Sequence, residues 1–319
     1  MAGPKQSRQP GDRAFHPELA AARWIPPFSY GPRLARMMRG LRPRAGDPGA
    51  GVTAEEIVVS PTVSLRVLRP ATAAVDLPAL LWIHGGGHLF GAPEQDDGAN
   101  AALVRELGIV VAAARYRLGA EAPAPASADD CYAALEHLAE HAEELGIDAR
   151  RIAVGGASAG GGIAAGVVLL AHDRGRIPIA CQLLVYPMLD DRTAGRDDLD
   201  SLRVRMWTPK SNRLGWATYL GTEPGSDDVP DYAAPARRED LTGLPPAWIG
   251  VGTLDLFHDE DVDYARRLER AGVPVELVVV PGAFHGFDQL FAETRVVRDF
   301  RRSQADALRR AGLSSAVAG

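Results

Sequence analysis

Apolar and polar positions along the chain fall into two alternating patterns, one typical of buried strands and one typical of helices. Short apolar or alternating runs predict strands at residues 56–59, 65–68, 78–83, 109–113, 151–155, 180–185, 248–251 and 275–280. Helix-length segments lie between or after the later runs, at residues 96–107, 127–145, 163–170, 260–271 and 286–313. Because strands joined by helices form parallel sheets, the pattern predicts an α/β fold whose mostly parallel central sheet is flanked by helices. The first two runs are spaced as an antiparallel pair at the edge of that sheet.

Two parts of the chain fall outside this alternation. Residues 17–24 and 32–41 predict two short N-terminal helices, and a long insertion between residues 186 and 245 contains a weakly amphipathic helix near residues 209–220. These parts carry Trp24, Trp207 and Trp216, and large aromatic side chains are seldom left uncovered. We therefore predict a helical cap over the C-terminal edge of the sheet, where such folds bind ligands; surface decoration is the alternative.

The predicted domain organisation follows from these segments. The N-terminal cap helices occupy residues 1–50, of which about the first 13 are expected to be disordered. The α/β domain is built from residues 51–190 and 245–319, and residues 191–244 form the cap insertion.

Composition narrows the class of partner. The chain has 319 residues, 46% of them hydrophobic, which is enough for a large core. A net charge of −6 argues against nucleic acid or an anionic membrane as the main partner, so a small molecule is expected. The two cysteines, Cys131 and Cys181, lie in apolar runs without metal-binding spacing and are expected to be buried thiols. No segment is apolar enough for a signal peptide or a membrane span, which predicts a cytoplasmic protein.

Ser158 lies at the centre of the strongest local signal. Gly156, Ser158 and Gly160 fit the pattern G-x-S-x-G, in which a serine occupies a strained turn between a strand and a helix. A hydroxyl held there projects above the sheet, and the helix behind it directs backbone N–H groups at a developing negative charge. An ordinary glycine-rich turn is the alternative when this segment is read alone.

A second glycine-rich segment, His84 to Gly87, follows the predicted buried strand at residues 78–83. Glycines leave backbone N–H groups uncovered, so Gly86 and Gly87 are expected to donate hydrogen bonds to an oxyanion together with the N–H of Ala159. His84 stands at the start of this turn, and we expect its ring to fix the loop rather than to transfer protons.

Two further loops supply an acid and a base. Asp255 follows the predicted strand at residues 248–251, where a carboxylate is well placed to orient an imidazole. His285 follows the last strand and completes the order Ser, Asp, His. The acidic residues Asp259 and Glu260 are expected to lie in the first turn of the next helix.

Taken together, these motifs closely resemble those of the bacterial hormone-sensitive-lipase-like carboxylesterases, a family of the α/β-hydrolase superfamily. The matching stretches are HGGG from residue 84, GASAG from 156, YPMLDD from 186, GTLDLFHDE from 252 and PGAFHGF from 281. The chain departs from the family pattern in two places. Ala157 stands where many relatives carry an aspartate, and residues 115–121 read RYRLGAE in place of the usual DYRLAPE.

The resemblance implies that Ser158 is the nucleophile, that His285 is the general acid and base with Asp255 as its partner, and that no metal or organic cofactor takes part. It also implies a fold of the α/β-hydrolase type and a small-molecule ester with a short acyl chain as substrate. We expect the substrate to contact four residues of the cap and the surrounding loops: His88, Trp207, Trp216 and Phe257. Relatives are often dimers, so a homodimer is one expectation for this chain.

Two alternatives to ester hydrolysis stay open. The same triad serves amide, lactone and carbamate hydrolases. A non-catalytic ligand receptor on this scaffold, as in the plant gibberellin receptors that resemble the family, is disfavoured because those receptors have lost the catalytic histidine, whereas this chain has His285.

Overall fold

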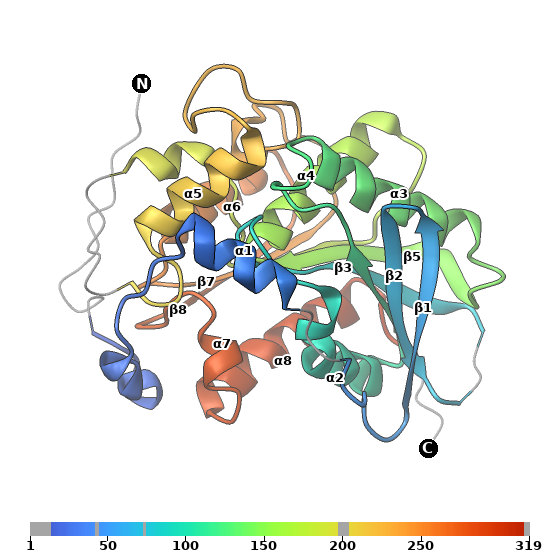
Figure 1. The fold of residues 1–319 in the computed structure, drawn as a ribbon. Helices are drawn as coiled ribbons and strands as arrows, with labels where there is room; N and C mark the ends of the chain where they lie inside the picture. Colours follow the sequence, from blue (N-terminus) through green and yellow to red (C-terminus); the bar gives the residue numbers. More distant parts are fainter. Residues whose placement is uncertain (1–13, 42–44, 73–74, 197–203, 316–319) are drawn as a thin grey trace.

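The computed structural model describes residues 14–41, 45–72, 75–196 and 204–315 (Figure 1). The disorder expected for the first residues of the chain therefore lies outside the described residues. Figure 1 shows a central sheet with helices on both sides and with the N-terminal helices in front of it.

The sheet has eight strands in the order β1-β2-β4-β3-β5-β6-β7-β8. Strand β2 is antiparallel to both β1 and β4, and all pairs from β4 to β8 are parallel. The prediction of a mostly parallel sheet with an antiparallel edge is therefore confirmed. The strands are β1 Val52–Ser60, β2 Val63–Pro70, β3 Leu77–Ile83, β4 Val110–Arg115, β5 Ile147–Ala157, β6 Gln182–Val185, β7 Ala247–Gly252 and β8 Val275–Val280.

Helices cover both faces of this sheet. Side chains of α3 (Ala126–Glu140), α4 (Ala159–Arg174) and α6 (His258–Arg270) share one hydrophobic cluster with the strands. Side chains of α2 (Asp97–Leu107) and α8 (Arg295–Arg310) share the other. Because both faces are covered, every residue of β3 is buried, which explains why this strand reads as a continuous apolar run. The shorter elements are η3 Pro93–Asp96, η4 Asp191–Gly195, η5 Pro235–Arg237 and α7 Phe287–Leu290.

Two segments far apart in sequence pack together above the C-terminal ends of the strands. The N-terminal segment contains η2 (Pro17–Trp24) and α1 (Pro32–Gly40), and the middle insertion contains α5 (Pro209–Leu220). The backbone N–H of Tyr30 donates to Ser211 Oγ at 2.9 Å, and the ring centroids of Tyr30 and Trp207 are 5.9 Å apart. A third hydrophobic cluster joins both segments to Ala159 and Phe257, which follow β5 and β7.

Trp24 corrects one expectation about these segments, because it is 77% exposed rather than covered. Residues 17–24 form a 3-10 helix, in which every third residue lies on the same face. Leu19 and Ala22 occupy the face that packs on the core, so Trp24 lies off it. Its indole is contacted instead by the Arg23 guanidinium, 5.2 Å from the ring centroid.

The predicted C-terminal helix is also wrong in its extent. It is divided into α7 and α8, with Thr294 as the N-cap of the second helix. The predicted helix at residues 127–145 likewise ends at Glu140, where turns lead into β5. Cys131 and Cys181 are both free and buried, as expected.

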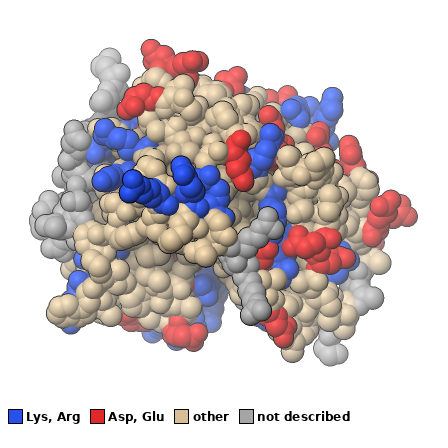
Figure 2. Space-filling view, in the orientation of Figure 1, with Lys and Arg blue, Asp and Glu red and all other residues tan. Residues whose placement is uncertain are grey.

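Charged side chains of both signs are interspersed on the face seen in Figure 2, with one row of basic side chains over α1. Arg33 and Arg36 of this helix are exposed. Within the described ranges, no helix combines the length and the hydropathy that crossing a bilayer requires.

A largely buried ion pair joins the two ends of the middle insertion. Asp191 in η4 is fully buried and accepts from Arg237 Nε at 2.7 Å and from Arg237 Nη2 at 2.8 Å. The same carboxylate accepts from the backbone N–H of Gly225 at 2.6 Å. Removing one member of such a pair leaves the other charge without compensation, and this is far more costly than losing an exposed pair.

We expect Asp191→Ala to lower the free energy of unfolding by about 3 kcal/mol, measured by urea denaturation. The matched control is Asp299→Ala, which removes an exposed pair with Arg295 on α8 and should cost less than about 1 kcal/mol. Equal costs for the two variants would contradict this account of the insertion.

Candidate active site

Ser158 joins the end of β5 to the start of α4 and has a backbone φ of +59° and ψ of −124°. A positive φ strains a residue that carries a Cβ, so the surrounding structure must hold this conformation in place. The Ser158 N–H donates to Val185 O at 2.9 Å. A Cβ at position 160 would lie 2.1 Å from Ile83 O, so the helix can approach β3 this closely only with glycine there.

A continuous hydrogen-bonded chain joins the three residues predicted to form a triad. Ser158 Oγ lies 2.9 Å from His285 Nε2, although the two residues are 127 positions apart in sequence. His285 Nδ1 lies 2.9 Å from Asp255 Oδ2. The second oxygen of Asp255 accepts from the N–H of Phe257 at 3.0 Å. With a carboxylate facing Nδ1, the proton belongs on that nitrogen, which leaves Nε2 free to accept the serine proton.

This chain of groups is nearly closed to solvent. Asp255 is only 1% exposed, and Ser158 and His285 are each 7% exposed. The three residues follow β5, β7 and β8, so they meet at the C-terminal edge of the parallel strands. Electrostatic interactions are stronger in such a place than in water.

Two aromatic rings hold the His285 imidazole from different sides. The Tyr186 ring contacts it edge-on at a centroid distance of 4.7 Å, and the Phe257 ring does so at 5.2 Å. The Tyr186 hydroxyl donates to Asp288 Oδ1 at 2.8 Å, so it is tied to the helix that follows His285. The sequence alone predicts no role at the site for Tyr186 or Asp288. Two signals pointed to Tyr186: it opens the YPMLDD stretch, and it directly follows a strand that neighbours β5.

The glycine-rich loop after β3 lies against Ser158. Gly86 and Gly87 have φ values of +126° and +61°. The backbone N–H groups of Gly86, Gly87 and Ala159 form no hydrogen bond with any residue that the structure describes. A Cβ at Gly87 would lie 1.9 Å from Trp207 Cη2, so the indole packs directly on this peptide. That these three donors face the serine hydroxyl stays a prediction.

The two histidines of this loop are buried and uncharged. His84 Nδ1 bonds to Gly85 O at 2.8 Å and the ring stacks on Tyr116, which agrees with the expected structural role. Burial lowers the pKa of His84 to about 4 and that of His88 to about 3. The His88 ring stacks on Tyr219.

The four residues expected to contact substrate lie in the glycine-rich loop or pack on it or on His285. Trp207 packs on Gly87, and Phe257 packs on His285. His88 is a residue of the loop, and its ring contacts Trp216 of α5; both side chains are almost completely buried. Contact between these residues and a substrate stays a prediction.

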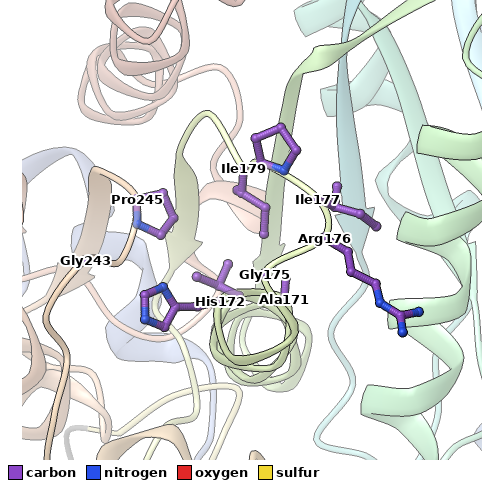
Figure 3. A pocket seen from close by; sticks show the side chains of 10 residues that line it. Ala171, His172, Gly175, Arg176, Ile177, Ile179, Gly243 and Pro245 are labelled. Atoms are coloured by element: carbon purple, nitrogen blue, oxygen red, sulfur yellow. The ribbon is translucent and has the colours of Figure 1, made fainter.

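A cavity of about 380 Å³ lies at the other end of α4 (Figure 3). Its lining includes His172, Arg176 and Pro245, and Figure 3 shows the Arg176 guanidinium directed away from His172. Because Ser158 caps the start of α4 and this cavity adjoins its end, the helix separates the two by roughly 20 Å. In the described part of the chain, no three His, Cys, Asp or Glu side chains are grouped as metal ligands.

His88 makes the stability of the fold sensitive to acid. Its pKa is about 3 in the folded state against 6.5 when exposed, so between these values the unfolded chain binds the extra proton. The free energy of unfolding therefore falls as the pH drops below 6.5, by about 1.4 kcal/mol for each pH unit. We expect His88→Phe to lose about 2 kcal/mol less of its free energy of unfolding than the wild type between pH 6.5 and 4.5, measured by urea denaturation.

The control for this measurement is His172→Phe, because His172 is exposed. It should show the wild-type pH dependence. A His88→Phe protein whose stability falls as steeply as that of the wild type would contradict the assignment of the loss to His88.

Comparison with known proteins shows the family to which this chain belongs. A family profile described as the alpha/beta hydrolase fold matches residues 80–289. Esterase LipI of Mycobacterium tuberculosis is 36% identical over 230 residues, which cover 70% of this chain and 71% of that protein. Carboxylesterase NlhH of the same species is 37% identical over 231 residues, with coverage of 70% and 71%. A solved structure, the bacterial heroin esterase, is 41% identical, superposes with a TM-score of 0.85, and is matched over 95% of this chain and 99% of its own. The chain therefore belongs to the α/β-hydrolase fold family, in the group of bacterial hormone-sensitive-lipase-like carboxylesterases.

Proposed function

We propose that this protein hydrolyses carboxylic esters with short acyl chains through an acyl-enzyme, with Ser158 as the nucleophile. The observation that carries the proposal is the hydrogen-bonded chain from Ser158 Oγ through His285 to Asp255, with 2.9 Å at each step. Relatives named as esterases support an ester as the bond that is broken. Small-molecule esters are accordingly the proposed partners.

The first half of the reaction forms the acyl-enzyme. His285 Nε2 accepts the hydroxyl proton while Ser158 Oγ attacks the ester carbonyl carbon. The carbonyl oxygen becomes an oxyanion, which the N–H groups of Gly86, Gly87 and Ala159 stabilise. The carbon–oxygen bond to the alcohol then breaks, and the alcohol leaves with the proton from Nε2. Asp255 stays ionised and stabilises the imidazolium.

The second half repeats these steps with water in place of serine. His285 Nε2 takes a proton from water, the hydroxide attacks the acyl carbon, and Ser158 leaves as the hydroxyl when the proton returns. Because nucleophile, base and oxyanion donors all come from the chain, the reaction needs no metal or organic cofactor.

The preference for short acyl chains is argued from the surroundings of the glycine-rich loop. The Trp207 indole packs on Gly87, and Phe257 is packed on His285, so aromatic rings crowd the place where an acyl chain would extend. We propose that residues 1–50 and 191–244 form the cap that carries Trp207 and Trp216. In this proposal Trp207 and Phe257 contact the substrate directly, and His88 and Trp216 support them.

The geometry of the site gives less support to a ligand receptor, and it does not by itself separate an ester from an amide, lactone or carbamate. The hydrogen bond between Ser158 and His285 disfavours a receptor, because binding alone does not require an activated serine. An amide, lactone or carbamate would use the same groups, so a comparison of leaving groups decides between them.

We expect Ser158→Ala to reduce kcat for an aryl acetate by a factor on the order of 10⁶, with the fold retained by circular dichroism. Asp255→Asn should reduce kcat by about 10⁴, because the imidazole then adopts the wrong tautomer. Ser303→Ala on α8 is the control for serine replacement, since the Ser303 hydroxyl donates to Phe300 O of its own helix. A Ser158→Ala protein with more than about 1% of wild-type kcat would exclude this serine as the nucleophile.

We expect kcat/KM to fall at least about tenfold from p-nitrophenyl butyrate to the octanoate, because the rings at the loop leave little room for a longer chain. The matched p-nitroanilide of butyric acid should turn over at least about 100 times more slowly than the ester. Faster turnover of the octanoate would contradict the proposed acyl preference, and an anilide hydrolysed as fast as the ester would indicate an amidase.

A further inference from the structure

The loop that carries Gly86 and Gly87 is held by two different parts of the molecule. Its first residues are fixed from the sheet: the Tyr116 hydroxyl donates to His84 O at 2.8 Å, and the two rings stack. The residues after Gly86 are covered by the N-terminal segment and the middle insertion. Arg39 Nε donates to Leu89 O at 3.1 Å.

The middle insertion contacts this loop at His88. Its φ is +61°, a strained value for a side chain other than glycine. The imidazole lies parallel to the Tyr219 ring, with an interplanar angle of 2° and a centroid distance of 3.8 Å. Neither ring nitrogen has a hydrogen-bond partner among the residues that the structure describes. Stacking on α5 therefore holds this side chain, and with it the backbone of the residue next to Gly87.

Tyr219 is itself fixed by its neighbours through the backbone. Its carbonyl oxygen accepts from Ala124 N at 2.7 Å. Gly119 lies so close that a Cβ there would be 2.7 Å from Tyr219 Cα and 3.0 Å from Tyr219 N. The N–H of Gly119 also donates to His88 O at 3.1 Å, so one residue contacts both members of the stack.

Gly119 belongs to the RYRLGAE run, which departs from the usual family pattern. The usual residue at this position, alanine, adds the methyl group that the backbone of Tyr219 excludes. The departure thus permits the close approach of α5 that brings Tyr219 onto His88.

We propose that Tyr219 is a positioning residue for the oxyanion hole: seated against Gly119 and stacked on His88, its ring holds the Gly86–Gly87 peptides so that their N–H groups face the acyl oxygen. This inference rests on the proposed function. It assigns α5 a part in stabilising the transition state, in addition to any part in limiting access.

The ring rather than the hydroxyl of Tyr219 is the element that acts. The hydroxyl is buried and has no hydrogen-bond partner among the described residues. Tyr219→Phe keeps the stacked ring and serves as the conservative rescue variant. Tyr219→Leu removes the flat ring while it keeps an apolar side chain of moderate size.

The experiment measures kcat and KM for p-nitrophenyl acetate and Ki for an aryl trifluoromethyl ketone, which adds to serine and places an oxyanion in the hole. For Tyr219→Leu we expect kcat to fall about 10- to 100-fold, which is no more than the loss caused by removing one oxyanion donor. KM should stay within about threefold of the wild-type value. Ki should rise by the same factor as kcat/KM falls. Tyr219→Phe should keep at least about half of the wild-type kcat.

Two further variants keep the test decisive if Tyr219→Leu does not fold. His88→Asn tolerates the positive φ but removes the ring, and it should lower kcat and raise Ki in the same way. Gly119→Ala displaces α5, so it should also lower kcat and raise Ki. In the double variant its effect should not add to that of Tyr219→Leu, because both changes act through the same contact. The control on α5 is Lys210→Ala, because Lys210 is exposed.

Two results would overturn the proposal. A Tyr219→Leu protein with a raised KM and unchanged kcat and Ki would show that α5 only limits access. Equal losses in Tyr219→Phe and Tyr219→Leu would show that stacking is not the cause. Failure of the proposed function is distinguishable from both, since the wild type itself would then lack turnover that depends on Ser158.

Discussion

The backbone at Ser158 is the constraint on which the rest of the site depends. A serine with φ of +59° is stable only where its surroundings forbid an alternative. Here the Ser158 N–H bonds to Val185 O, and its carbonyl oxygen accepts from Met188 N at 3.0 Å. The start of α4 lies so close to Ile83 O that a Cβ at position 160 has no room. Three neighbouring strands, β3, β5 and β6, therefore converge on one residue, which explains why the hydroxyl projects from the sheet toward His285.

Burial shifts the pKa values of several titratable side chains near this serine. His84 and His88 are neutral because burial lowers the pKa of each to about 4 and about 3. Burial raises the pKa of Asp96 to about 7, despite its hydrogen bond from Trp82 Nε1, and burial also raises the pKa of Asp288. In the proposed mechanism, Asp255 and the N–H groups of Gly86, Gly87 and Ala159 are the polar groups that respond to the charges formed during ester cleavage.

The segments above the sheet do more than cover the serine. Trp207 packs on Gly87, Arg39 bonds to Leu89 O, and Tyr219 stacks on His88. Each contact falls on the loop that carries the proposed oxyanion donors, and each comes from outside the sheet and its flanking helices. The loop is consequently defined by the sheet at one end and by the covering segments at the other, so movement of those segments would change the geometry of the donors.

Local signals in the sequence were sufficient for the antiparallel pair at the edge, the mostly parallel sheet and the chain of Ser158, His285 and Asp255. Period and turn chemistry are properties of neighbouring residues, and a residue that follows a parallel strand must lie at one known edge. Local signals could not predict three further contacts. These are the hydrogen bond from Tyr186 to Asp288 beside His285, the stack of Tyr219 on His88, and the close approach of α5 at Gly119. They join residues from separate segments, and their distances depend on how closely those segments pack. The exposure of Trp24 was missed for the same kind of reason: a helix of 3-10 rather than α geometry turns its side chains to different neighbours, and tertiary packing selects between the two.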